Sequence, residues 1–163
     1  MLRFAAAFAA VLSLTTAACA DPAPAPAPEG VTQISFRTTP LEIVTAAGPQ
    51  RFTVEVAETP EQRERGLMYR ETMAADAGMI FDYHRDVAIS MWMKNTVLPL
   101  DMVFVRADGT VSGVATGAVP YSLDIIASGE PVRAVVELNA GTVERLGIKA
   151  GDTVRHEIFG NAP

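Results

Sequence analysis

The feature that most constrains this chain is an apolar stretch, Val87 to Val105, with polar residues set into its middle. The stretch carries only two charges, Lys94 and Asp101, and one proline, Pro99. A membrane-spanning helix would hold these groups near the bilayer centre, where a lysine or an aspartate is costly. We therefore expect two buried strands joined by a polar turn, with partners for the polar side chains inside it.

Alternation of apolar and polar residues predicts a series of further short strands. The expected strands are 41–45, 51–57, 78–81, 87–93, 100–106, 110–118, 123–127, 132–138 and 153–158. The first two should form a hairpin, and Asp108-Gly109 predicts another between 100–106 and 110–118, because Asp-Gly favours a tight turn. Many short strands at this spacing predict a mainly β, jelly-roll-like sandwich or barrel in a single domain.

Two short helices are expected as well. Thr59 is followed by a proline and then by Gln62 at the third helical position, which together form a capping box. Gly66 limits this first helix, because glycine weakens a helix interior and suits its end. Asn139 is expected to cap a second helix that runs to Leu146 and stops at the following glycine.

Residues 1–20 have the features of a secretory signal peptide. Arg3 precedes an apolar run, 4–14, that is too short to cross a bilayer, and small residues follow it. Ala18-Cys19-Ala20 is an A-x-A cleavage signal, which predicts a periplasmic or secreted protein. In the alternative, residues 16–19 act as a loose lipobox, Cys19 is lipidated, and the protein is lipid-anchored in the cell envelope. Membrane attachment is expected only in that second case.

Residues 21–32 form a Pro/Ala-rich linker, in which alternating prolines favour an extended spacer. Residues 33–163 then form the β-rich domain. Cleavage after residue 20 removes the only cysteine, so the domain must be stable without disulfides. The chain has 19 acidic and 13 basic residues and a net charge of −6, which argues against nucleic acid as a partner.

The central stretch also resembles a known family. Trp92-Met93-Lys94-Asn95-Thr96, followed by Pro99-Leu100-Asp101 and Phe104, resembles the motif of domain of unknown function family 192, which is prokaryotic and uncharacterised. Matching segments flank this motif at Arg63, 66–68, Arg70, 78–81, 136–138, 140–141 and 151–152. The resemblance covers roughly residues 52–158. It implies a compact β-rich domain of jelly-roll character, often secreted, with no established activity.

Polar and aromatic residues of this motif form the predicted ligand site. The tryptophan would serve as a platform, the cations as donors, and the remaining polar groups would orient a small polar ligand such as a sugar or a carboxylate. The predicted ligand-binding residues are Trp92, Lys94, Asn95, Thr96, Asp101 and Arg70. We expect a non-enzymatic binding module for such a ligand or for a cell-envelope component, without a cofactor.

Three alternatives stay open at this point. Lys94 and Asp101 could form an ion pair that only fixes a loop. They could instead serve an enzyme, with a lysine of lowered pKa as base or nucleophile. Thirdly, Trp92 could be the exposed anchor of a structural protein that binds an envelope partner. No catalytic residue is assigned, because the mature domain lacks a cysteine nucleophile, a G-x-S-x-G elbow and a phosphate-binding loop.

Metal chemistry has weak support in the sequence. Asp82, His84 and Asp86 would share one face of an extended strand, but the number of ligands is too small for a defined site, so no metal is assigned. The methionines are expected to be adaptable core residues, with copper binding through thioethers as the alternative. They include Met68, Met73, Met79, Met91, Met93 and Met102.

Overall fold

A computed structural model describes residues 34–162, so the expected signal peptide, the linker and Cys19 lie outside the described residues. The strands are β1 (Arg37–Thr45), β2 (Gly48–Ala57), β3 (Ala77–Met91), β4 (Leu100–Val105), β5 (Val111–Ala118), β6 (Ile126–Asn139) and β7 (Thr153–Arg155). The helices are α1 (Pro60–Arg65), α2 (Thr142–Leu146) and a 3-10 turn (Glu157–Phe159). Within 34–162, no helix has the length and apolar character needed to cross a membrane.

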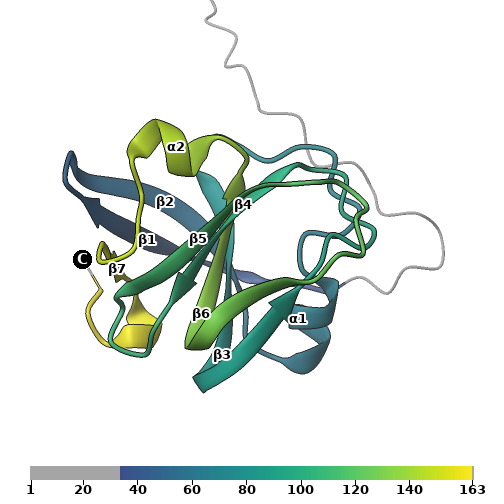
Figure 1. The fold of residues 1–163 in the computed structure, drawn as a ribbon. Helices are drawn as coiled ribbons and strands as arrows, with labels where there is room; N and C mark the ends of the chain where they lie inside the picture. The colour runs from purple at the N-terminus through teal and green to yellow at the C-terminus, as the bar shows by residue number, and fades with distance from the viewer. Residues whose placement is uncertain (1–33, 163) are drawn as a thin grey trace, which may run out of the picture.

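The seven strands form one sheet in the order β5-β4-β6-β3-β2-β1-β7 (Figure 1). Neighbours pair antiparallel except β2 and β3, which are parallel. The sheet curls so far that its two edges meet at one corner, where Val154 N donates to Gly109 O at 2.7 Å. The expected mainly β fold class is confirmed, in the form of a half-barrel with two short helices.

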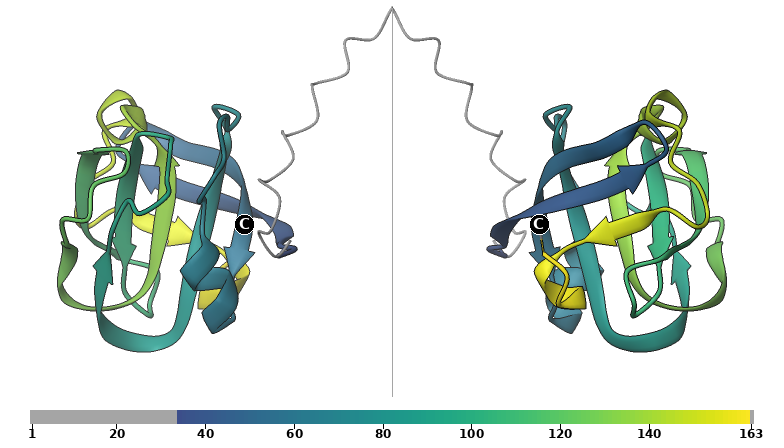
Figure 2. Two further views of the ribbon diagram at one scale, coloured as in Figure 1. Left: turned by 90° about the vertical axis from the view of Figure 1, so that its right-hand side faces the viewer. Right: turned by 90° about the vertical axis from the view of Figure 1, so that its left-hand side faces the viewer.

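Both faces of the sheet are buried, and each face carries its own apolar cluster. The first cluster takes residues from all seven strands, among them Ile80 and Val136, so it fills the inside of the half-barrel. The second cluster contains their sequence neighbours Phe81 and Val135 together with Leu67, which follows α1. Figure 2 shows α1 and α2 at opposite ends of the curled sheet.

Several local predictions are confirmed. The hairpin of β1 and β2 turns between Thr45 and Gly48, and that of β4 and β5 turns after Val105. The capping box of α1 is formed, since Gln62 N donates to Thr59 Oγ1 at 3.2 Å and Thr59 N donates to Gln62 Oε1 at 3.1 Å. These features depend on residues close in sequence, which is why the pattern alone predicts them.

Two strand predictions were wrong in their boundaries. Segments 78–81 and 87–93 belong to one strand, β3, whose pairing with β6 is interrupted by a bulge between Asp82 and Val87. Within this bulge His84 has a φ of 64°, a left-handed conformation that is common in turns. This local irregularity is where the sequence analysis predicted a turn between two strands. Segments 123–127 and 132–138 likewise contribute to one strand, β6, which begins at Ile126. The two long strands pair with each other, so the ladder resumes beyond each irregularity.

The second helix and the last strand are also shorter than predicted. Helix α2 starts at Thr142 after Gly141, so Asn139 is not its cap; the Asn139 amide donates instead to Ala74 O at 3.0 Å. Strand β7 ends at Arg155, because the chain then turns into the 3-10 segment. The missing helix cap comes from a residue far away in sequence, Asp101.

Candidate functional site

Four of the predicted site residues surround two adjoining hollows between α1 and the loop 92–99. Trp92 and Thr96 line a cavity of about 80 Å³. Lys94 and Asn95 line a wider groove of about 310 Å³. The two hollows share the lining residues Glu64, Arg65 and Met68. The motif therefore builds one wall of a concave region, although its members divide between two compartments.

Backbone hydrogen bonds hold the loop 92–99 in place. Asn95 has a φ of 55°, which asparagine tolerates better than most residues, and its carbonyl accepts a hydrogen bond from Tyr69 N at 2.9 Å. The Thr96 carbonyl accepts from Tyr121 N at 3.1 Å, and the Thr96 hydroxyl donates to Lys94 O at 3.2 Å. These bonds join the loop to the segment after α1 and to the β5–β6 loop, so the polar residues of the motif first of all shape the loop.

Trp92 and Lys94 lie on the solvent side of this loop. The Trp92 side chain is 45% exposed, and Lys94 Nζ lies 5.2 Å from the centroid of its ring, within the range of a cation–π contact. Four more apolar side chains are highly exposed in the β5–β6 loop. They are Val119, Tyr121, Leu123 and Ile125. Met93 N donates to Ser122 O at 2.9 Å, so this apolar loop contacts the loop of Trp92.

Asp101 is fully buried in β4 and lines neither hollow. Its Oδ1 accepts a hydrogen bond from Gly117 N at 2.9 Å, and its Oδ2 accepts one from Val143 N at 2.9 Å. Val143 is the second residue of α2, so Asp101 supplies the helix cap that Gly141 cannot. No ion pair between Lys94 and Asp101 is found in residues 34–162.

Arg70 also lies away from the hollows. Its guanidinium forms an ion pair with Glu55 on β2 and lies 5.8 Å from the centroid of the Phe36 ring. The structure thus gives Arg70 and Asp101 partners of their own, whereas Trp92, Lys94, Asn95 and Thr96 remain beside the concave region.

A candidate site residue that the sequence interpretation missed is Glu137 on β6. It pairs with Met79 on β3 and with Met102 on β4, and its side chain lines the cavity with only 4% of its surface exposed. No hydrogen bond or ion pair to its carboxyl group is found among residues 34–162. Burial raises the pKa of Glu137 to about 8. An acid between Val136 and Leu138 in a buried strand is the signal that could have revealed it.

Aromatic and sulfur-containing side chains form much of the remaining cavity wall. Tyr83 contacts Met91 through a hydroxyl that lies 3.7 Å from the Met91 sulfur, and burial raises the pKa of Tyr83. The guanidinium carbon of Arg63 lies 5.0 Å from the Tyr83 ring centroid. Further lining residues are Met68, Phe81, Ser90 and Trp92. The cavity therefore combines a protonated carboxyl group with electron-rich walls.

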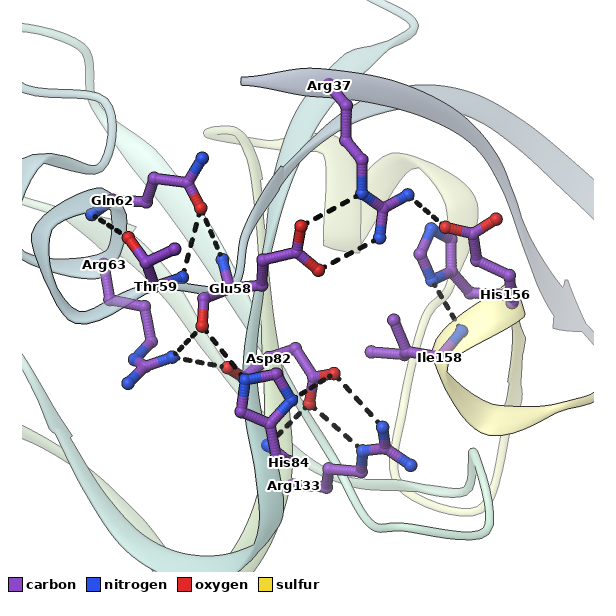
Figure 3. A network of polar contacts seen from close by, with 11 residues as sticks. Arg37, Glu58, Thr59, Gln62, Arg63, Asp82, His84, Arg133, His156 and Ile158 are labelled. Carbon is purple, nitrogen blue, oxygen red and sulfur yellow. Dashed lines mark hydrogen bonds and ion pairs between the residues drawn. The ribbon is translucent and has the colours of Figure 1, made fainter. Parts of the chain in front are cut away.

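A polar network holds α1 against β3 next to this cavity (Figure 3). Arg63 Nη1 donates to Glu58 O at 2.6 Å and to Asp82 O at 2.9 Å. Burial raises the pKa of Asp82, but hydrogen bonds from Arg133 and from the His84 backbone outweigh this and lower the pKa overall. Both Asp82 oxygens are thus engaged by protein groups. No metal-binding group of three His, Cys, Asp or Glu side chains is found in the described part of the chain.

The capping role of Asp101 predicts a loss of stability on Asp101→Asn. The amide would place an NH₂ group against one of two backbone N–H donors, so we expect the free energy of unfolding to fall by about 1–3 kcal/mol. Urea denaturation measures this loss. The matched control is Glu71→Gln, which removes an exposed charge and should stay within about 0.5 kcal/mol of wild type. Wild-type stability in Asp101→Asn would contradict the capping role.

The raised pKa of Glu137 predicts a pH-dependent effect of Glu137→Gln. Its pKa rises on folding from 4.5 to about 8, so between these values the unfolded chain loses the proton that the folded chain keeps. The contribution of Glu137 to stability is therefore largest below pH 4.5 and is lost as the pH rises to 8. From pH 4.5 to 8, Glu137→Gln should gain about 4 kcal/mol relative to wild type. Denaturant unfolding at both pH values measures this, and an unchanged difference would refute the assignment.

Comparisons with known proteins place the chain in a family. The sequence model of the family described as Uncharacterized ACR, domain of unknown function 192, matches residues 42–156. A Sinorhizobium meliloti 1021 protein, described as a candidate transcription regulator, is 48% identical; the match covers 78% of this chain and 99% of that one, with a TM-score of 0.75. A Novosphingobium aromaticivorans DSM 12444 protein of unknown function is 36% identical, over 82% of this chain and 93% of that one, with a TM-score of 0.73. The comparison with curated proteins found no significant match. The chain belongs to domain of unknown function family 192.

Proposed function

We propose that this domain binds a small polar ligand in the hollows between α1 and the loop 92–99, and that it acts as a binding module rather than an enzyme. The observation that carries the proposal is the Glu137 carboxyl group, which is buried, faces the cavity and has no protein partner in residues 34–162. A buried polar group without a partner is costly, and a ligand that bonds to it offsets that cost. Such groups concentrate at functional sites.

The surroundings of Glu137 support binding more than catalysis. Trp92 and Thr96 belong to a loop that is fixed by backbone hydrogen bonds. The sheet supplies other parts of the cavity wall, among them Phe81 on β3 and Glu137 on β6. Loops on a rigid scaffold commonly carry binding sites. The enzyme hypothesis needs Lys94 and Asp101 in one site, but the Asp101 carboxylate is occupied by two backbone amides and lines neither hollow. The acidic net charge supports a partner other than nucleic acid.

An envelope protein that docks on the exposed apolar loop is the second candidate. Trp92 is 45% exposed, and Tyr121, Leu123 and Ile125 are each more than 60% exposed in the adjoining loop. Exposed apolar side chains that cluster in this way are typical of contact surfaces. We rank this candidate below the ligand site, because the unpartnered carboxyl group lies in the cavity and not on this surface.

A thermal-shift screen tests the ligand site. The compounds are amines, sugars, amino acids, nucleotides and peptidoglycan fragments. A ligand at a hundred times its Kd stabilises the fold by about 2.7 kcal/mol, which should raise Tm by roughly 5–10 °C. Trp92→Ala removes part of the cavity wall and should reduce the shift, whereas Leu123→Ala, at a more exposed apolar site that lines neither hollow, should keep it. No shift with any class would contradict ligand binding and leave the apolar loop as the better-supported site.

We also propose that the protein is exported, on the basis of the signal features in residues 1–20. The product should be found in the periplasm or medium with an intact mass that begins at Asp21. The alternative is a lipid-anchored envelope protein, for which the mass would begin at Cys19 and include acyl chains. Cell fractionation with intact-mass measurement distinguishes the two. An uncleaved protein in the cytoplasm would refute both.

A further inference from the structure

Glu137 contributes a buried carboxyl group to the lining of the cavity. Glu137 lies on the interior strand β6, with β3 and β4 on either side, and only 4% of its surface is exposed. Its carboxyl group has no protein donor within residues 34–162, so the ionised form would be stabilised by a donor from outside the protein, and a ligand in the cavity can supply one. An anionic ligand would be repelled by this group once it ionised. The site therefore favours a ligand that donates hydrogen bonds and carries positive charge.

The cavity walls favour the same kind of ligand. Phe81, Tyr83 and Trp92 contribute aromatic rings, and Met68 and Met91 contribute thioether sulfurs. Aromatic faces attract cations, and Arg63 and Lys94 already lie over Tyr83 and Trp92, so Phe81 is the ring that a ligand cation would contact; sulfur is a soft, polarisable neighbour. A ligand with a single cationic donor group needs only one carboxylate, and Glu137 supplies the buried one of the two that line the cavity, the other being the exposed Glu64.

The other charged groups around the cavity come from α1 and β3. Arg63, Glu64 and Arg65 of α1 and Tyr83 of β3 line it together with Glu137. The Arg63 guanidinium is bound to two backbone carbonyls and stacks on Tyr83, so it is fixed in the wall and does not pair with Glu137. Burial alone accounts for the raised pKa of Glu137, so no neighbouring cation offsets the cost of its ionisation. A cation that enters the cavity from solution would offset the cost of ionising Glu137.

We infer that the cavity accepts the primary ammonium group of an organic amine, with the Glu137 carboxylate as its ion-pair partner. This inference rests on the proposed function and specifies its ligand class. The cavity of about 80 Å³ has room for the ammonium group and a short carbon chain. The groove of about 310 Å³, which shares Arg65 and Met68 with the cavity, has room for the remainder of a longer molecule.

Binding of an amine at this site must release a proton. Glu137 is protonated in the empty protein at pH 7 because its pKa is about 8, whereas the ion pair requires the carboxylate. One protonated amine therefore enters, one carboxylic proton leaves to solvent, and the complex contains one ammonium and one carboxylate. Below a pH of about 8, affinity should rise about tenfold for each pH unit, and above it affinity should level off.

Isothermal titration calorimetry with pentylamine, 1-pentanol and pentanoate tests the inference. These probes share a chain and differ in the charge of the end group. At pH 7, in phosphate and in HEPES, pentylamine should bind at least tenfold more tightly than 1-pentanol and release nearly one proton. Pentanoate should not bind. Glu137→Gln should abolish both the amine preference and the proton release, whereas Glu144→Gln, the same change on the exposed face of α2, should alter neither.

The outcomes separate this inference from the proposed function. Amine binding that is no tighter than that of 1-pentanol, or that is independent of pH between 6 and 8 in the wild-type protein, overturns the amine assignment. If 1-pentanol or a neutral compound from the thermal screen then binds in a Trp92-dependent way, the small-ligand function stands without it. If no probe and no screened compound binds, both fail. The wild-type pH series needs no variant, so a misfolded Glu137→Gln protein would not weaken the test.

Discussion

The burial of residues 134–138 of β6, on both faces and along both edges of the strand, is the constraint on which the candidate site depends. The strand has β3 and β4 on its two edges, and its side chains enter apolar clusters on both faces of the sheet, as Val135 and Val136 show. A polar side chain on such a strand is cut off from water. Glu137 is in this position, and its carboxyl group keeps its proton near neutral pH for that reason. Glu137 lines the cavity, which is the direction from which the proposed ligand would approach.

Two buried carboxyl groups in neighbouring strands have opposite roles because their surroundings differ. Asp101 on β4 accepts hydrogen bonds from two backbone amides, one of them in the first turn of α2. These two bonds join β4 to β5 and to α2, so Asp101 fixes the fold. Glu137 on β6 lacks such donors among residues 34–162 and faces a hollow. The two acids therefore differ in the donors around them and not in chemical type, and this difference is what singles out Glu137 as the candidate site residue.

The cavity is assembled from segments that lie far apart in the chain. Helix α1 contributes Arg63, which is held by backbone carbonyls of Glu58 and Asp82, and the loop 92–99 contributes Trp92. The polar network in Figure 3 fixes α1 against β3, while backbone hydrogen bonds fix the loop. Both walls are thus positioned by bonds that leave the Glu137 carboxyl group unused. Because both walls are already held in place by these bonds, the cavity is preformed, and ligand binding would require little reorganisation of the protein.

Local patterns in the sequence determined the mainly β class, the two hairpins, the capping box of Thr59 and Gln62, and the loop with its polar motif. Each depends on residues within a few positions of one another. Only the tertiary structure decided that β6 lies between β3 and β4, which buries Glu137, and that Asp101 caps α2 instead of pairing with Lys94. Strand order arises from pairing between distant segments, and the periodicity of a strand records which of its faces is apolar but not which strand becomes its neighbour.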